Sequence, residues 1–226
     1  MCRGVRVGLV VAGLLGGGCG TFARGGGSRH HSDSYLPLEV GAVWRYLVTR
    51  DDGQRGSGTV RIEGIDYAAS RSDAPEYRVR EDLLDGTIWS WENREPDLVR
   101  REQQELEDRS EMVVGEESYD PPDTVLDERP EHLRLGAAWS EAFFETVPNI
   151  KGRPKSKRVE VKWEVESVAD QVTVPAGTFT CLRVRRAEKH RPPIVSWYAR
   201  GVGLVRQTGA GALGDQTLAL ANTRFP

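Results

Sequence analysis

Apolar and polar residues alternate along most of the chain with a period of two, the pattern of β-strands that bury one face. The clearest run is residues 159–166, where valines and a tryptophan alternate strictly with glutamates and a lysine. Shorter runs of the same kind begin at Trp44, Val60 and Tyr77. About ten such segments follow one another at short spacing, which predicts a mainly β protein built on an antiparallel sheet.

Turn signals separate these segments. Asp85-Gly86 lies between two apolar pairs, which is typical of a tight hairpin, and Asp52-Gly53 and Pro175-Ala176-Gly177 mark two further turns. Residues 98–112 raise the question of one short helix, because they are rich in Glu, Gln and Arg. Their apolar residues are sparse and make a poor helical stripe, so a short helix and a long exposed strand both stay open here.

Residues 1–18 have the organisation of a secretory signal peptide. Arg3 and Arg6 supply positive charge, residues 7–15 form an apolar run too short to span a bilayer, and small residues precede Cys19. The segment resembles the signal peptides of bacterial lipoproteins, although Gly16 stands where leucine is usual. The resemblance implies that Cys19 is acylated and becomes the mature N-terminus. Ordinary secretion, with cleavage after residues 21–23, and a cytosolic protein with a glycine-rich head are the alternatives.

Residues 19–34 have the composition of a flexible lipid tether, since they are rich in Gly, Ser, Arg and His. Ten of the 25 glycines fall within the first 27 residues, and the remaining composition is that of a folded protein. We therefore expect residues 35–226 to form a single antiparallel β domain. His30 and His31 have no accompanying cluster of ligands, so neither a metal nor a cofactor is predicted.

A faint internal repeat divides this domain into two similar halves, 35–131 and 132–226. Residues 38–44 and 133–139 each place a glycine three residues before a tryptophan, and a proline-containing stretch at 120–130 lies between the copies. Neither half alone has enough apolar residues for a core. We expect both halves to contribute to one sheet.

Motifs that carry chemistry are scarce. The G-x-G-x-x-G pattern at residues 209–214 lacks the following helix of a dinucleotide site, so we interpret it as a hairpin loop. The sequence has no P-loop, H-E-x-x-H, G-x-S-x-G or paired-cysteine zinc pattern. His132 and His190 belong to no known constellation and are expected at the surface, while Cys181 is expected to pack inside a strand. The sequence predicts no catalytic residue, and we do not expect an enzyme.

Charge is distributed unevenly, although the net charge of −3 argues against a general nucleic-acid binder. Residues 97–131 hold 13 acids against four arginines, and a later loop is strongly basic. The basic loop is either a solvated hairpin tip or a contact for anionic lipid headgroups or an acidic partner. Its basic residues are Lys151, Arg153, Lys155, Lys157 and Arg158.

Trp89 and Trp91 form a second candidate site. They lie two residues apart on one predicted strand and therefore share one face of the sheet. That face either packs in the core or forms the floor of an apolar groove that binds a ligand.

Two segments carry a wider resemblance: residues 35–46, which end in Trp44-Arg45-Tyr46, and residues 174–205, which include Trp197-Tyr198-Ala199. Together they resemble a broad group of bacterial envelope proteins, many of them lipoproteins, that includes the TapB-like domains. The resemblance implies the curved antiparallel sheet of the Lol-type lipoprotein carriers, here a curved sheet or half-barrel of about ten strands. It transfers no catalytic residue.

The expected protein is therefore an envelope lipoprotein with a non-enzymatic role. Its N-terminal lipid would anchor it in the membrane, and Gly20 after Cys19 favours the outer membrane, facing the periplasm. Its apolar sheet face would bind a lipid, another hydrophobic ligand or an envelope protein partner. The alternative is a structural component of a cell-surface assembly that has no small-molecule ligand.

Overall fold

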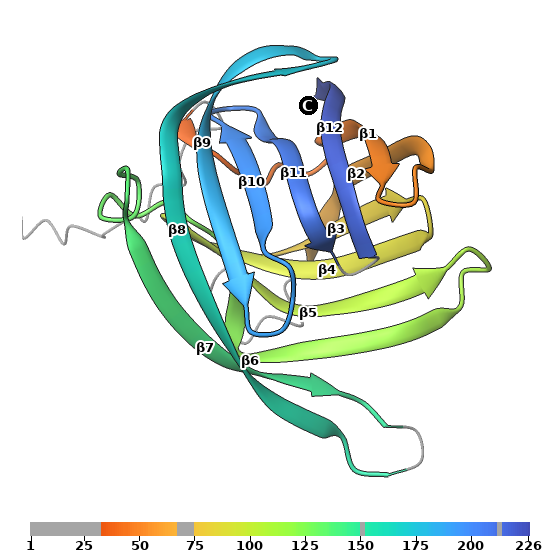
Figure 1. Cartoon of the computed structure of the whole chain (residues 1–226). Coiled ribbons are helices and arrows are strands. Elements are labelled where there is room, and N and C mark those ends of the chain that lie inside the picture. The colour runs from red at the N-terminus through yellow and green to blue at the C-terminus, as the bar shows by residue number, and fades with distance from the viewer. Residues whose placement is uncertain (1–32, 67–74, 150–151, 212–213) are drawn as a thin grey trace, which may run out of the picture.

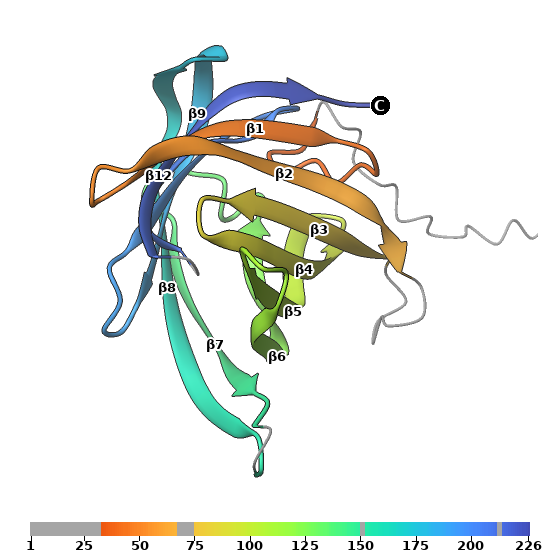
Figure 2. The same cartoon turned by 90° about the vertical axis from the view of Figure 1, so that its right-hand side faces the viewer.

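The computed structural model describes residues 33–66, 75–149, 152–211 and 214–226. The predicted signal peptide, Cys19, nearly all of the tether and Lys151 lie outside the described residues. The described chain forms twelve antiparallel strands (Figures 1 and 2). They are β1 (Val43–Arg50), β2 (Arg55–Asp66), β3 (Glu76–Leu83), β4 (Gly86–Glu95), β5 (Leu98–Asp108), β6 (Val113–Asp127), β7 (Ala138–Val147), β8 (Lys155–Val174), β9 (Gly177–Glu188), β10 (Ile194–Ala199), β11 (Gly203–Gly211) and β12 (Gly214–Arg224).

The sheet closes into a barrel. Each strand pairs with its neighbours in sequence, and β1 also pairs with β12. The mainly antiparallel β fold is thus confirmed, but the prediction of a curved open sheet or half-barrel of about ten strands is wrong. The closing ladder joins the two ends of the domain, and pairing between such distant strands leaves no local pattern in a sequence.

Residues 98–108 form strand β5 and not a helix. They pair with β4 on one side and with β6 on the other, and these ladders decide between the two readings of the segment. The described part of the chain contains no helix that is long and apolar enough to cross a membrane.

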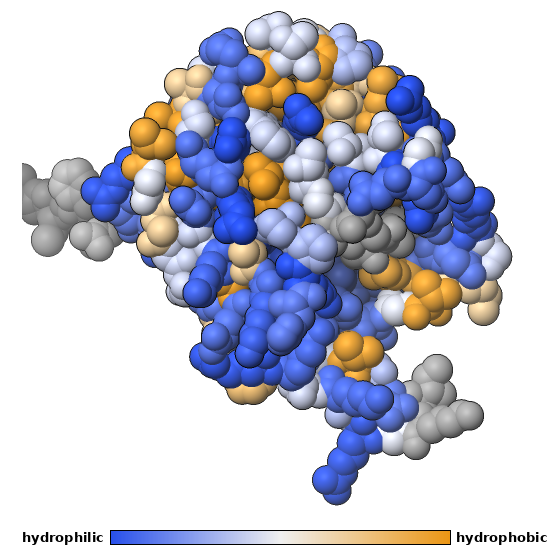
Figure 3. Space-filling model, in the orientation of Figure 1, coloured by the Kyte–Doolittle hydropathy of each residue, from blue (hydrophilic) through white to orange (hydrophobic). Residues whose placement is uncertain are grey.

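The alternation seen in the sequence sorts side chains to the two faces of the wall. In β8, Val161, Trp163 and Val165 are buried, whereas Lys162 and Glu164 between them are exposed. Hydrophilic residues cover much of the outer surface, while hydrophobic ones gather at the top of the view in Figure 3. Cys181 is fully buried in β9, as expected for a packed cysteine.

The wall is weakest between β6 and β7. Their ladder joins only residues 118–120 to residues 144–146. Pro121 and Pro122 come next in β6, and a proline has no N–H to donate to a neighbouring strand. The rest of β6 therefore pairs with β5 alone, and the first part of β7 pairs with β8 alone.

The two ends of the barrel differ. The described turns that follow β1, β3, β5 and β9 gather at one end, which we call the turn end. The described termini and the connections after β4, β6, β8 and β10 lie at the opposite, terminal end. At the terminal end the segment 34–38 crosses the barrel, and Leu38 joins the core cluster around Trp44. The β8–β9 hairpin packs there as well, with the Ala176 N–H donating to the Leu220 carbonyl at 3.0 Å. These segments close the terminal end.

Candidate functional site

The barrel encloses a cavity of about 460 Å³, which falls in the range of small-molecule sites. Arg191 and Pro192, in the β9–β10 connection, line this cavity and are exposed, so it reaches the surface at the turn end. Its apolar wall comes mainly from β1 to β4. Ile88 is buried there but belongs to neither core cluster, because its side chain faces the cavity. Other apolar residues of this wall are Leu38, Val60, Ile62, Val79 and Leu83.

A first group of charged residues lies on the cavity wall around Arg101 of β5. The sheet register places Glu92 opposite Arg101, and the Arg101 guanidinium donates to the Glu92 carboxylate at 2.9 Å. Arg101 also donates to the Gln104 side-chain oxygen at 3.1 Å. The Glu81 carboxylate lies 4.0 Å from the same guanidinium. One arginine therefore faces two carboxylates, of which only Glu92 takes a short hydrogen bond.

The network continues from Gln104 to Glu117. The Gln104 amide and the Tyr119 hydroxyl each donate to the Glu117 carboxylate at 2.8 Å. These three side chains line the cavity, and no cation contacts Glu117 in the described part of the chain. Glu117 is therefore a carboxylate held by neutral donors.

A second group surrounds Arg186 of β9. Its guanidinium donates to both carboxylate oxygens of Asp123, at 2.9 and 3.1 Å, and forms an ion pair with Glu188. Glu188 also pairs with Arg191 at 3.3 Å. Asp123 belongs to β6 and Arg186 to β9, so this contact crosses the place where β6 and β7 no longer pair. Here two arginines balance two carboxylates.

Burial changes the acidity of several cavity groups. It raises the pKa of Glu81, which the nearby Arg101 offsets only in part, and the neighbouring Glu92 raises it further. Burial likewise raises the pKa of Asp123 in spite of Arg186. Burial also raises the pKa of the Tyr198 hydroxyl to about 12, so this phenol stays neutral at physiological pH.

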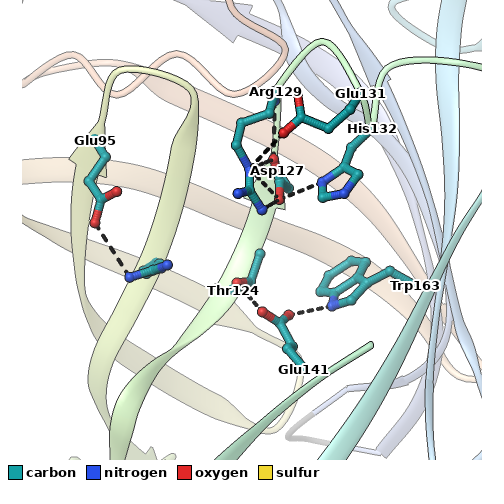
Figure 4. A network of polar contacts seen from close by, with 9 residues as sticks. Glu95, Thr124, Asp127, Arg129, Glu131, His132, Glu141 and Trp163 are labelled. Carbon is teal, nitrogen blue, oxygen red and sulfur yellow. Dashed lines mark hydrogen bonds and ion pairs between the residues drawn. The ribbon is translucent and has the colours of Figure 1, made fainter. Parts of the chain in front are cut away.

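Side chains bridge the gap between β6 and β7 (Figure 4). The Glu141 carboxylate of β7 accepts hydrogen bonds from the Thr124 hydroxyl of β6 at 2.7 Å and from the Trp163 indole N–H of β8 at 2.5 Å. Trp139 stacks on Trp163, with ring centroids 5.9 Å apart. These contacts replace part of the missing backbone ladder.

Close to this bridge, His132 is held between Asp127 and Trp139. Its Nδ1 lies 2.7 Å from the Asp127 carboxylate (Figure 4). Its ring stacks on Trp139, with ring centroids 3.9 Å apart. The Asp127 and Trp139 contacts cover most of the ring, so His132, expected at the surface, is half-buried with its side chain 16% exposed. Among the described residues, His132 has no hydrogen bond to a Ser, Thr or Cys side chain, so the pair lacks the nucleophile of a catalytic triad.

The closed terminal end contains another buried carboxylate, Glu128. It accepts hydrogen bonds from the Ser34 hydroxyl at 2.8 Å, the Tyr35 N–H at 3.1 Å and the Leu36 N–H at 3.3 Å. Arg94 donates to Glu128 at 3.0 Å and to the Leu36 carbonyl at 2.7 Å. Ser34, placed in the tether by composition, is thus buried and fixed to the barrel.

The predicted aromatic pair does not belong to the cavity. Trp89 and Trp91 share one face of β4, but that face is the outer one, because Ile88 and Glu92 occupy the inward positions. Both tryptophans are half-buried, and the guanidiniums of Arg78 and Arg80 lie over the Trp89 ring. The apolar groove predicted for this face is therefore not the cavity.

The described residues of the basic loop lie at the β7–β8 hairpin and are all exposed. Lys157 pairs with Glu145 at 2.7 Å, and Arg158 pairs with Glu160. Glu145 also lines the cavity, so the hairpin begins at the rim of the turn end. The structure does not bring this loop together with Trp89 and Trp91. The exposed residues are Arg153, Lys155, Lys157 and Arg158.

The charged residues of the cavity were not predicted from the sequence, although one signal was present. Glu81 lies two residues after Val79 and two before Leu83, so it shares their inward face of β3. A charge at an apolar position of a strand indicates either a paired core residue or a binding site.

Comparison with known proteins adds little. No protein-family model matches the chain, and a search of curated proteins finds no relative. A predicted lipoprotein from Parabacteroides distasonis ATCC 8503 is structurally similar with a TM-score of 0.40, 12% identity, and coverage of 84% of this chain and 98% of that one. A predicted exported protein with a YmcC-like fold from Bacteroides fragilis NCTC 9343 is similar with a TM-score of 0.35 and 12% identity. That match covers 84% of this chain and 98% of the other one. Both TM-scores are low, so neither similarity indicates a function here, and the resemblance to TapB-like and Lol-type proteins stays a prediction.

Proposed function

We propose that the protein has a non-enzymatic role in the cell envelope and binds a hydrophobic or amphiphilic small molecule inside its barrel. The observation that carries this proposal is the cavity of about 460 Å³, since a barrel filled by its own side chains would leave no such space. The wall from β1 to β4 is mainly apolar, with Glu81 and Glu92 as its charged residues, whereas β5, β6 and β9 supply further charged groups. A ligand with one apolar and one polar end fits this division.

An enzymatic role is the competing interpretation of the same cavity. Raised pKa values, such as those of Glu81 and Asp123, are typical of groups that transfer protons in catalysis. Burial accounts for both upward shifts without a reaction, and the neighbouring arginines only reduce them. If the protein is a binder, mass spectrometry will recover an added amphiphile unchanged after long incubation; recovery of a product would contradict this.

Membrane anchoring through Cys19 is part of the proposal. It is supported by the signal-peptide resemblance and by the place where the described chain begins: Arg200 donates to the Asp33 carbonyl at 2.8 Å, at the closed end. An anchor there leaves the cavity mouth free. We further propose that the protein lies at the outer membrane and faces the periplasm. The Cys19→Ser variant should lose both palmitate labelling and its association with the membrane fraction. A variant that stays labelled and membrane-bound contradicts the anchor.

Ligand binding can be tested with N-phenyl-1-naphthylamine, a neutral apolar dye that fluoresces when it leaves water. We expect the purified protein to bind the dye and Leu106→Trp to lose binding, because Leu106 lines the cavity. Lys162→Trp is the matched control, since it adds the same side chain at an exposed position of β8. If Leu106→Trp is folded and binds the dye as well as Lys162→Trp does, the cavity is not the binding site.

The second candidate function is a structural role in a surface assembly, favoured by the exposed basic residues of the β7–β8 hairpin. Anionic lipid headgroups are the partner that such a cluster suits. We expect this role to appear as cosedimentation with phosphatidylglycerol vesicles, but not with phosphatidylcholine vesicles, that is lost in Arg153→Glu/Lys155→Glu. Equal sedimentation of the variant would exclude the hairpin as the contact.

A further inference from the structure

We propose that the ligand of the cavity is an amphiphile whose polar end is a cation, such as a primary ammonium, and that Glu81 is its counter-charge. This inference rests on the proposed binding function and adds the chemical class of the ligand.

The charge balance of the cavity wall is the first argument. Six carboxylates and three guanidiniums line it, which gives a formal charge of 3 − 6 = −3. Glu145 is balanced by Lys157 outside the lining, and the group around Arg186 and Arg191 is balanced internally. The excess negative charge therefore belongs to the group around Arg101, in Glu81, Glu92 and Glu117.

The second argument is the geometry of Glu81. Arg101 is engaged at short distance with Glu92 and Gln104, so within the described residues Glu81 keeps only the 4.0 Å ion pair with Arg101. Its side chain is 22% exposed although the residue points inward, because it faces the cavity. A carboxylate in a site of low polarity without a short hydrogen bond gains strongly from an ammonium, which supplies both charge and donors.

The third argument is the surroundings of Glu81. Val79 and Leu83 lie on the same face of β3, and Ile88 of β4 lies directly opposite Glu81 in the ladder. An alkyl chain attached to the ammonium would lie on these apolar side chains. The burial that raises the pKa of Glu81 shows that Arg101 does not fully compensate its charge.

The polar end also has donors to satisfy. Arg101 and Arg186 each keep a buried Nε–H that has no hydrogen-bond partner in the part of the chain that the structure describes. A carboxylate on the ligand could accept from them, but it would enter a cavity whose wall already carries excess negative charge. A neutral hydroxyl or carbonyl oxygen beside the ammonium satisfies an Nε–H without that repulsion.

The test compares three probes that share one alkyl chain: decylamine, decanol and decanoate. Each is titrated at neutral pH, below its aggregation threshold, against the protein loaded with N-phenyl-1-naphthylamine. We expect decylamine to displace the dye about tenfold more tightly than decanol, from the strength of a charge-assisted hydrogen bond. Decanoate should be the weakest of the three.

Variants locate the effect. In Glu81→Gln the ratio of decylamine affinity to decanol affinity should fall to about one. Glu164→Gln, which removes an exposed carboxylate from the outer face of β8, is the control and should keep the preference. Decanoate binding as tightly as decylamine, or a preference that survives Glu81→Gln, overturns the inference and leaves the binding function standing. If none of the probes nor the dye binds, the proposed function itself fails.

Discussion

Two inward-facing carboxylates of this barrel differ in how fully the protein supplies their hydrogen-bond and ion-pair partners. Glu128, at the closed end, is fully buried and accepts hydrogen bonds from a hydroxyl, two backbone N–H groups and Arg94. Glu81, in the cavity, has only a distant ion pair with an arginine that is already engaged. The carboxylate at the closed end has all its partners within the protein, whereas the one in the cavity has capacity left for a ligand.

The difference separates structural from functional buried charge. A saturated carboxylate holds chain segments together, and its loss should reduce stability. An unsaturated one costs stability and is retained where binding requires it. Both expectations can be measured by equilibrium unfolding and by ligand titration.

The largest expected effect is at the closed end. Glu128→Gln should lower the free energy of unfolding by about 3 kcal/mol, because Arg94 loses its buried partner. Denaturant unfolding measures this, with Glu164→Gln as control at within about 0.5 kcal/mol of the parent. Hydrogen exchange at the Tyr35 and Leu36 amides should accelerate in Glu128→Gln. If Glu128→Gln is as stable as the control, Glu128 does not stabilise the closed end of the barrel.

Asp127→Asn gives an intermediate effect that depends on pH. Burial alone would raise the pKa of Asp127, but hydrogen bonds from Arg129 and His132 outweigh it and hold the pKa below its ordinary value of 3.8. The folded state therefore binds fewer protons than the unfolded state, and Asp127 stabilises the fold above that value. We expect a loss of about 1–2 kcal/mol at neutral pH.

This loss should shrink as the pH falls through the folded-state pKa of Asp127, where the parent also loses the carboxylate charge. Unfolding curves recorded at a series of pH values measure it. Asp51→Asn, in an exposed turn, is the matched control. A difference that stays constant down to strongly acidic pH would mean that the hydrogen bonds do not depend on charge.

Glu81→Gln should have a smaller effect of opposite sign. The pKa of Glu81 is raised above its ordinary value of 4.5, so the folded state binds more protons than the unfolded state between the two pKa values. Stability falls as the pH rises through that interval. At neutral pH the variant should therefore be more stable than the parent, by about 1 kcal/mol, and the gain should vanish below the ordinary value. Destabilisation at neutral pH would show that Glu81 is as satisfied as Glu128.

The smallest effect is expected on the outer face of β4. Trp89→Phe and Trp91→Phe should change the affinity for N-phenyl-1-naphthylamine by less than about twofold, because neither residue lines the cavity. Loss of dye binding in a folded variant would place the ligand on the outer face instead.

Local patterns predicted the strands well and their closure poorly. The alternation in residues 159–166 and the Asp85-Gly86 turn correspond to β8 and to the β3–β4 hairpin. The β1–β12 ladder, in contrast, depends on the summed curvature of all twelve strands, which no single segment encodes.

The candidate site was less accessible to sequence reasoning. The inward position of Glu81 follows from its spacing of two residues from Val79 and from Leu83. The pairing of Arg101 with Glu92, in contrast, depends on the ladder between β4 and β5 and on a register shift beside Trp91. Trp89 and Trp91 attracted attention because aromatic residues often line ligand sites. Their position, one residue out of phase with Ile88, places them on the outer face.

The short β6–β7 ladder gives the barrel a mechanical asymmetry. Six strands lie on each side of it, and the opposite junction, β1 with β12, is paired over the whole length of β1. The β1–β12 junction is therefore the more extensively paired of the two, whereas the β6–β7 junction is paired only at residues 118–120 of β6. Parting the wall at this junction requires loss of that short ladder and of the Thr124–Glu141 and Asp123–Arg186 contacts, while every other ladder stays intact.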